Sequence, residues 1–206
     1  FLGQMLVLYL LCTKLSYEQK SINKKDYQKK IKDLLSLSKS AKNTLNIEDK
    51  IQTLGKDFAN SKGSMFLGRG YSYPIALEGA LKLKELAYVH AEGYPAGEMK
   101  HGPLALIEEG MPVVVIAPRD EHYKKTISNM QEVISRGAKV LLITNKSTDE
   151  IYSENIWEQI EVDAISDELI PFLTTIPLQK LAYYSALDKG YDIDKPRNLA
   201  KSVTVE

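Results

Sequence analysis

Residues 112–144 read PVVVIAPRDEHYKKTISNMQEVISRGAKVLLIT and carry the clearest structural signal in the chain. Two runs of consecutive apolar residues, 112–117 and 139–144, have the composition of strands that are buried on both faces, as in a parallel sheet. Between them, residues 121–136 have the spacing of a helix, which Gly137 closes. A strand, a helix and another strand in this order indicate a parallel βαβ unit and therefore an α/β fold.

The same alternation continues on both sides of this unit. A short apolar run at 64–68 predicts another buried strand, and it ends in the turn Gly68-Arg69-Gly70. The other expected elements are a helix from about Tyr73 to Ala91, a loop over 92–103, a strand over 157–162 and a helix over 169–189 closed by Gly190. We therefore expect an α/β three-layer sandwich with a mostly parallel sheet. Ligands of such sheets bind beyond the carboxyl ends of the strands, where the Gly68 turn and the residues after Ala117 lie.

The first 60 residues predict helices of two kinds. Residues 1–12 are apolar almost throughout, but they are too short to span a bilayer as a helix and lack the basic region of a signal peptide. We interpret them as a buried helix of a longer protein, whose apolar face stays exposed unless another segment or a second copy covers it. Residues 18–46 predict an amphipathic helix with a solvated lysine face, and residues 47–60 predict another helix.

Composition excludes several classes of protein. The chain has 206 residues, of which 44% are hydrophobic and 26% are charged, as is typical of a globular protein with a real core. Because 27 basic residues balance 27 acidic ones, a globally basic nucleic-acid-binding protein is disfavoured. The one cysteine, Cys12, excludes a disulfide framework and a multi-cysteine zinc site, and it is compatible with a reducing compartment.

Three charged residues of the helix predicted after Tyr73 form a stripe. Glu78, Lys82 and Glu85 are spaced i, i+4 and i+7, so they lie on one face of that helix. Spacing alone leaves two interpretations open. The stripe is either an exposed ladder of weakly stabilising ion pairs, which is common, or a lysine held between two carboxylates in a pocket, where protons can be exchanged.

Histidines supply a second candidate for proton transfer. His101 lies in the loop sequence GEMKHGP, and histidine exchanges protons near neutral pH, although a loop histidine can also serve only as a hydrogen-bonding partner of the backbone. His90 is interpreted as structural and His122 as exposed. Because no two histidines have the spacing of zinc ligands, no metal site is expected. The Gly68-Arg69-Gly70 turn lacks the third glycine of a dinucleotide-binding fingerprint.

Four segments together resemble one enzyme family. They are GRG at 68–70, PIALEGALKLKE at 74–85, GEMKHGPLAL at 97–106 and PRNLAKSVTVE at 196–206. The chain is similar over its whole length to the C-terminal isomerase part of the glucosamine-6-phosphate synthase family, also called glutamine–fructose-6-phosphate aminotransferases (isomerizing). The last segment is especially diagnostic, because other proteins with a sugar isomerase (SIS) domain end differently.

The resemblance implies a flavodoxin-like SIS fold and three parts in this chain. Residues 1–46 would be the last helix of a preceding SIS domain plus a helical linker, 47–190 a second SIS domain, and 191–206 a catalytic C-terminal tail. A glutaminase domain and most of the first SIS domain would precede them in the parent chain. Cys12 lies inside an apolar helix and cannot replace the nucleophilic cysteine of the glutaminase domain.

The resemblance also implies a reaction. The family converts fructose 6-phosphate and glutamine-derived ammonia to glucosamine 6-phosphate in hexosamine biosynthesis, in the cytoplasm, as a homodimer and without a metal or organic cofactor. The implied partners are a sugar-phosphate substrate, a second copy and the two missing domains, with neither nucleic acid nor membrane. Little turnover is expected of these residues alone, because the first SIS domain supplies the loops that grip the phosphate. The alternatives are a non-catalytic SIS module that binds a sugar phosphate or a protein, and a deglycase that acts on sugar–amine adducts.

The family pattern gives the C-terminal tail a direct part in this chemistry. Lys201 matches the lysine that forms a Schiff base with the open-chain sugar, which requires its free amine. Ala200 matches a residue that contacts the sugar through its backbone. The Gly68-Arg69-Gly70 turn is, by the same resemblance, structural rather than phosphate-binding.

The same pattern assigns catalytic roles to four further residues. Glu85 matches the base that moves a proton between C1 and C2 of the sugar, and Lys82 and Glu78 match the pair that assists it from the same helix. His101 matches the residue that opens the sugar ring and reaches the site of a neighbouring subunit. The resemblance thus favours a functional stripe over an exposed ladder.

Overall fold

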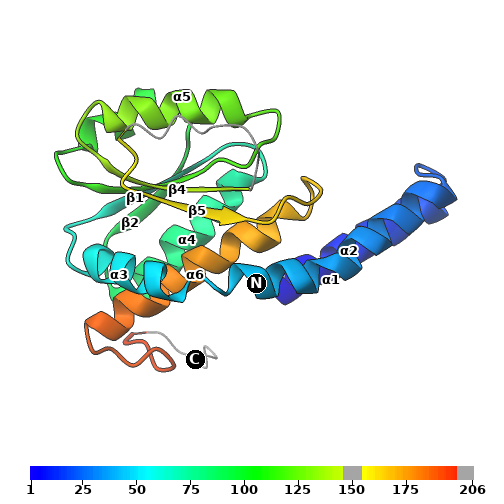
Figure 1. Cartoon of the computed structure of the whole chain (residues 1–206), viewed down its shortest axis with the longest axis horizontal. Coiled ribbons are helices and arrows are strands. Elements are labelled where there is room, and N and C mark those ends of the chain that lie inside the picture. The colour runs from blue at the N-terminus through cyan, green and yellow to red at the C-terminus, as the bar shows by residue number, and fades with distance from the viewer. Residues whose placement is uncertain (146–154, 199–206) are drawn as a thin grey trace, which may run out of the picture.

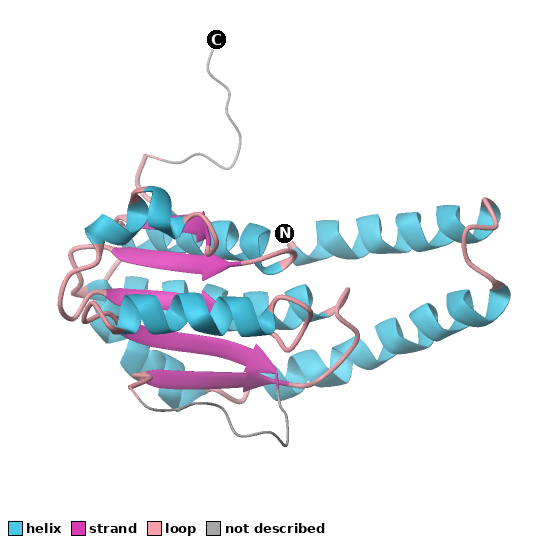
Figure 2. Ribbon diagram, turned by 90° about the horizontal axis from the view of Figure 1, so that it is seen from above, coloured by secondary structure: helices cyan, strands magenta, loops and turns pink. Residues whose placement is uncertain are grey.

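A central sheet organises the molecule, for which a computed structural model describes residues 1–145 and 155–198. Within these residues five strands pair in parallel in the order β2-β1-β3-β4-β5 (Figure 2). They are β1 (Ser64–Gly68), β2 (Ala91–Pro95), β3 (Pro112–Ile116), β4 (Lys139–Asn145) and β5 (Glu158–Val162). This is the strand order of flavodoxin-like sheets, so the predicted fold class is confirmed.

Helices cover both faces of the sheet. Helices α3 (Glu48–Ala59), α4 (Ser72–Ala87) and α6 (Ile170–Asp188) lie on one face, and α5 (Tyr123–Ile134) lies on the other (Figure 1). Two short 3₁₀ helices, η1 (Met99–His101) and η2 (Pro103–Leu106), follow β2. The three predicted layers are therefore present.

Each face of the sheet has its own apolar core. Phe66 of β1 points toward α3, α4 and α6, where it joins Phe58 and Leu83, all fully buried. Its neighbours Met65 and Leu67 point the other way, toward α5. Because successive side chains alternate between two buried faces, the inner strands need apolar residues at every position, which explains the continuous runs in the sequence.

The structure differs from the sequence-based expectation at the second strand. Residues 91–95 form β2, where a loop was predicted, and α4 ends at Ala87 rather than near Ala91. Pro95 is tolerated because β2 is an edge strand. Gly93 is required because a Cβ there would lie 2.9 Å from the backbone of Leu77 on α4. Tyr88 ends the helix in the left-handed region, with φ 53°.

An antiparallel helical hairpin projects past the carboxyl ends of the strands (Figure 2). It consists of α1 (Leu2–Glu18) and α2 (Lys24–Thr44), and Tyr17 and Tyr27 stack near its tip with ring centroids 4.6 Å apart. Every residue of α1 is described, and Thr13 alone is buried. The predicted exposure of this apolar helix is therefore confirmed. Within the described ranges no helix has both the length and the apolar character needed to cross a membrane.

Candidate active site

The charged stripe lies on a helix that is pressed closely against its neighbours. Gly79 lets α4 approach α6 and the sheet, because a Cβ there would lie 2.8 Å from Leu178 and 3.0 Å from Phe66. The adjacent Glu78 is 8% exposed. The stripe therefore includes a carboxyl group at a position where water is scarce.

The three charged side chains differ in their environments. Lys82 Nζ donates a 2.5 Å hydrogen bond to Glu85 Oε2, and both of these side chains are 29% exposed. Glu78 Oε1 has no hydrogen-bond partner among the described residues. Burial raises the pKa of Glu78, the charge of Lys82 opposes this shift, and the charge of Glu85 adds to it. A fully exposed ladder does not fit this geometry.

Such a set of groups suits proton transfer. The lysine ammonium fixes the orientation of the Glu85 carboxylate, which stays accessible enough to meet a bound molecule. The buried Glu78 is a carboxyl whose proton is held more tightly than usual. Paired acidic groups with different environments are a common basis of acid–base chemistry.

His101 lies apart from the stripe. It follows the carboxyl end of β2, its side chain is 78% exposed, and its Nε2 lies 3.8 Å from Glu98 Oε2. Glu85 lies near the far end of a 16-residue helix, roughly 20 Å along its axis from the first turn. Because α4 runs back along the sheet, Glu85 and His101 are at opposite ends of the strands within one chain.

The tail residues Ala200 and Lys201 lie outside the described residues, and so does residue 199. The described chain up to Asn198 nevertheless returns to α4. Tyr191 and Ile193 pack against the core under the sheet, and the Arg197 amide donates a 2.7 Å hydrogen bond to the Tyr88 hydroxyl. The base of the tail therefore meets α4 one turn beyond Glu85.

Sequence reasoning missed Tyr88. It fell inside the helix predicted from about Tyr73 to Ala91, where an aromatic residue is usually a core residue. The contact with Arg197 joins residues far apart in the chain, so spacing could not reveal it.

The glycine turn after β1 has a structural role. A Cβ on Gly68 would lie 2.3 Å from the carbonyl oxygen of Ser72, so the entry of α4 requires glycine there. The Arg69 guanidinium donates hydrogen bonds of 3.1 and 2.9 Å to Asn129 Oδ1 and lies against Gly97. Through these bonds Arg69 links the turn to α5. This contact is in line with the structural role that the resemblance implied for the turn.

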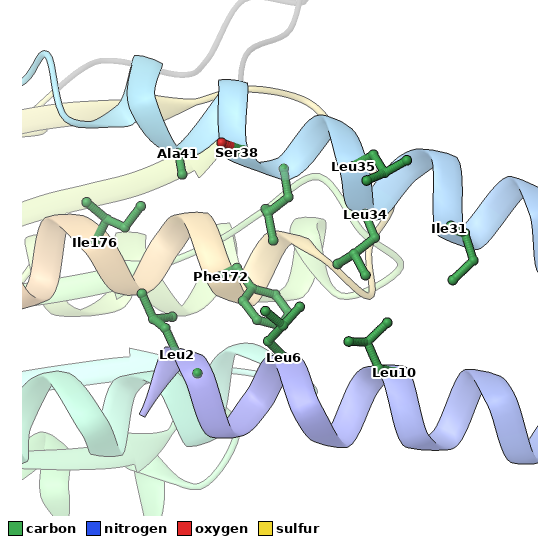
Figure 3. A pocket seen from close by; sticks show the side chains of 12 residues that line it. Leu2, Leu6, Leu10, Ile31, Leu34, Leu35, Ser38, Ala41, Phe172 and Ile176 are labelled. Carbon is green, nitrogen blue, oxygen red and sulfur yellow. The ribbon is translucent and has the colours of Figure 1, made fainter.

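A large apolar groove separates the two helices of the hairpin. It has a volume of about 610 Å³, and leucines of α1, apolar side chains of α2, and Phe172 and Ile176 of α6 face it (Figure 3). Its lining includes no titratable side chain, so it suits packing rather than catalysis. Among the described residues no three His, Cys, Asp or Glu side chains are grouped closely enough to hold a metal ion.

Similar proteins agree with this architecture. Residues 57–188 match the SIS domain family. The chain is 49% identical over its full length to a glutamine–fructose-6-phosphate aminotransferase (isomerizing) of Bacteroides thetaiotaomicron, and 45% identical to that of Aquifex aeolicus. In both cases it covers 33% of the relative, so the chain spans about a third of the length of the relatives it matches.

A solved structure agrees over nearly the whole chain. The C-terminal domain of glucosamine-fructose-6-phosphate aminotransferase from Francisella tularensis matches 95% of this chain and 55% of that domain's chain, with a TM-score of 0.91 and 40% identity. These similarities confirm the resemblance that the sequence motifs indicated. Because the SIS match covers more than half of the chain, this protein belongs to the SIS domain family.

Proposed function

We propose that this chain is the isomerase part of a glutamine–fructose-6-phosphate aminotransferase. The observation that carries the proposal is the α4 stripe, in which a buried Glu78 adjoins the Lys82–Glu85 ion pair inside a chain that resembles these enzymes from end to end. The substrates would be fructose 6-phosphate and ammonia derived from glutamine, and the product glucosamine 6-phosphate.

The proposed chemistry divides between the tail and α4. The Lys201 amine attacks the C2 carbonyl of the open-chain sugar and expels water to form a Schiff base, which ammonia then displaces. Glu85, as a carboxylate, takes a proton from C1 and returns a proton to C2. Lys82 holds Glu85 in place through their hydrogen bond, and Glu78 assists from the same helix face. Ala200 would contact the sugar through its backbone.

His101 would open the sugar ring in a neighbouring subunit. The opposite positions of His101 and Glu85 within one chain support this arrangement, because a single copy does not join them. A homodimer is therefore part of the proposal. So are the cytoplasmic location and the three-part division into 1–46, 47–190 and 191–206.

The apolar hairpin supports the proposal that a first SIS domain precedes this one. Residues 1–46 would contribute its last helix and the linker, and the rest of that domain would cover the groove between α1 and α2. That domain would also hold the phosphate of the sugar, and a glutaminase domain would supply ammonia.

Borohydride trapping of the full-length protein tests this function. With millimolar fructose 6-phosphate, reduction and peptide mass mapping should give a sugar adduct on Lys201. Lys201→Ala should abolish both the adduct and the formation of glucosamine 6-phosphate. Lys84→Ala, which removes an exposed lysine of α4, is the matched control and should change neither.

The same experiment separates the alternatives. A non-catalytic sugar-phosphate-binding module would bind the sugar and give no adduct, and Lys201→Ala would leave its function intact. A deglycase would release free amine from a fructosamine phosphate instead of forming glucosamine 6-phosphate. Either result would contradict the proposed function.

A further inference from the structure

We propose that Tyr88 and Arg197 form an anchor that positions the C-terminal tail for the proposed reaction. The inference rests on the proposed role of Lys201. It assigns to Tyr88 a positioning function that acts through the tail and involves no contact with the sugar.

Three contacts define the anchor. The Tyr88 hydroxyl accepts a 2.7 Å hydrogen bond from the Arg197 backbone amide. The Arg197 guanidinium lies over the Tyr88 ring, 4.1 Å from its centroid. The Tyr88 and Tyr191 rings also pack against each other, with centroids 4.7 Å apart. One tyrosine thus holds the tail at two points, residues 191 and 197.

The segment between these points is internally ordered. The Asp192 carboxylate accepts hydrogen bonds from the amides of Asp194 and Lys195, at 2.9 and 3.1 Å. Ile193 packs against the apolar core, and Pro196 restricts the backbone just before the anchored amide. Residues 191–197 therefore form a short, stiff loop that starts at the end of α6 and closes on Tyr88.

The anchor ties the tail to the helix that carries the proposed base. Tyr88 follows Glu85 by three residues, and its left-handed backbone, with φ 53°, turns the ring out at the end of α4. These contacts therefore connect residue 197 to the end of the helix that carries Glu85.

Covalent geometry limits how far Lys201 can lie from the anchor. Four Cα–Cα steps separate the anchored Arg197 from Lys201, a span of about 14 Å at most. Fixing residue 197 therefore excludes chain conformations in which Lys201 starts far from α4, which lowers the entropic cost of bringing its amine to the sugar. Misplacing a reacting group by about 1 Å can cost roughly 100-fold in rate. Loss of an anchor this close to Lys201 in the sequence should therefore lower the rate strongly.

The test compares Tyr88→Ala, Tyr88→Phe and Arg197→Ala in the full-length protein. Tyr183→Phe, which alters an exposed tyrosine of α6, and Arg136→Ala, which alters an arginine bonded to the last turn of α5, are the matched controls. The readouts are kcat, KM for fructose 6-phosphate, the rate of borohydride-trapped adduct formation at Lys201, and the thermal midpoint.

We expect Tyr88→Ala to lower kcat and the adduct rate by about 10-fold to 100-fold, with KM changed by less than about threefold. Tyr88→Phe keeps both ring contacts and loses the acceptor, so its loss should be smaller. Arg197→Ala keeps the backbone amide, so its kcat and adduct rate should lie between those of Tyr88→Ala and those of the wild type. The controls should match the wild type.

Three outcomes are decisive. A folded Tyr88→Ala protein with the wild-type adduct rate overturns the anchor. So does a loss in all variants that follows only the fraction of folded protein, since that is a merely structural role. If the wild type itself forms no adduct at Lys201, the proposed function fails, and this inference fails with it.

Discussion

Helices α1 and α6 have the same kind of sequence and opposite surroundings. Both are apolar around their whole circumference, yet α6 buries 13 of its 19 residues and α1 buries one of 17. Helix α6 packs against α3, α4 and strands β4 and β5, whereas the main contacts of α1 are with α2, the other helix of the hairpin. An apolar helix therefore shows only that burial is needed, and the surrounding elements decide whether it is achieved.

The largest effect is expected from truncating leucines of the two helices. Leu178 of α6 is 1% exposed, so Leu178→Ala should lower the free energy of unfolding by about 2–5 kcal/mol, through lost contacts and a cavity. Leu8 of α1 is 59% exposed, and Leu8→Ala should change it by less than about 0.5 kcal/mol. Urea denaturation of the 206-residue chain measures both. A cost above about 1 kcal/mol for Leu8→Ala would show that α1 is covered in solution.

Glycine-to-alanine substitutions should change the stability in opposite directions in a closely packed helix and in α1. A Cβ on Gly55 of α3 would lie 2.6 Å from Cβ of Tyr184 on α6, so Gly55→Ala should destabilise the chain by about 1–3 kcal/mol. Gly3 of α1 has no atom within 4 Å of such a Cβ, so Gly3→Ala should stabilise it by up to about 1 kcal/mol. Thermal denaturation checks both. If both substitutions shifted the stability in the same direction, the proposed difference in packing between α3 and α1 would be wrong.

Charge gives a third, smaller contrast. The raised pKa of Glu78 means that the folded state favours its protonated form, mainly because of burial. Its contribution to stability is present below the unfolded-state pKa and is lost as pH rises through the folded-state pKa. Because Glu78→Gln cannot ionise, its free energy of unfolding should rise relative to that of the wild type as pH increases through the range in which Glu78 ionises in the folded state. Urea denaturation across this range measures the gain. Glu121→Gln, at an exposed site, should show none.

The smallest effect concerns the ion pair that fastens the hairpin to the rest of the molecule. Lys30 of α2 pairs with Glu168, which precedes α6, and the two side chains are 27% and 45% exposed. Burial tends to lower the pKa of Lys30, but the hydrogen bond and charge of Glu168 outweigh it and raise the pKa. Glu168→Gln should cost less than about 1 kcal/mol at low salt, and the cost should shrink in about 1 M salt. A cost that does not depend on salt would show that packing holds the hairpin.

The raised pKa of Lys30 also sets a pH limit for that ion pair. A lysine whose pKa is higher in the folded state adds stability below its unfolded-state pKa and loses it as pH rises through the folded-state value. The difference between the wild type and Glu168→Gln should therefore be constant near neutral pH and vanish at strongly alkaline pH.

Local patterns were sufficient where burial is uniform. The inner strands are covered on both faces, so they contain uninterrupted runs of buried apolar residues, at 112–116 and at 140–143, and these runs are easily recognised in the sequence. The edge strand 91–95 was missed because its free side admits Pro95 and its close approach to α4 requires Gly93, so it has no continuous apolar run. The stripe on α4 was found from helical spacing, but whether it was exposed was not.

The α/β class, the helical stripe Glu78–Lys82–Glu85 and the motifs of the family could be recognised from local sequence, since they depend on residues near one another in the chain. The burial of Glu78, the position of His101 at the opposite end of the strands from Glu85 and the contact of Tyr88 with Arg197 became visible only in the folded structure. Each of these depends on contacts between residues that the chain separates widely. Chain topology brings such residues together, and local periodicity carries no information about it.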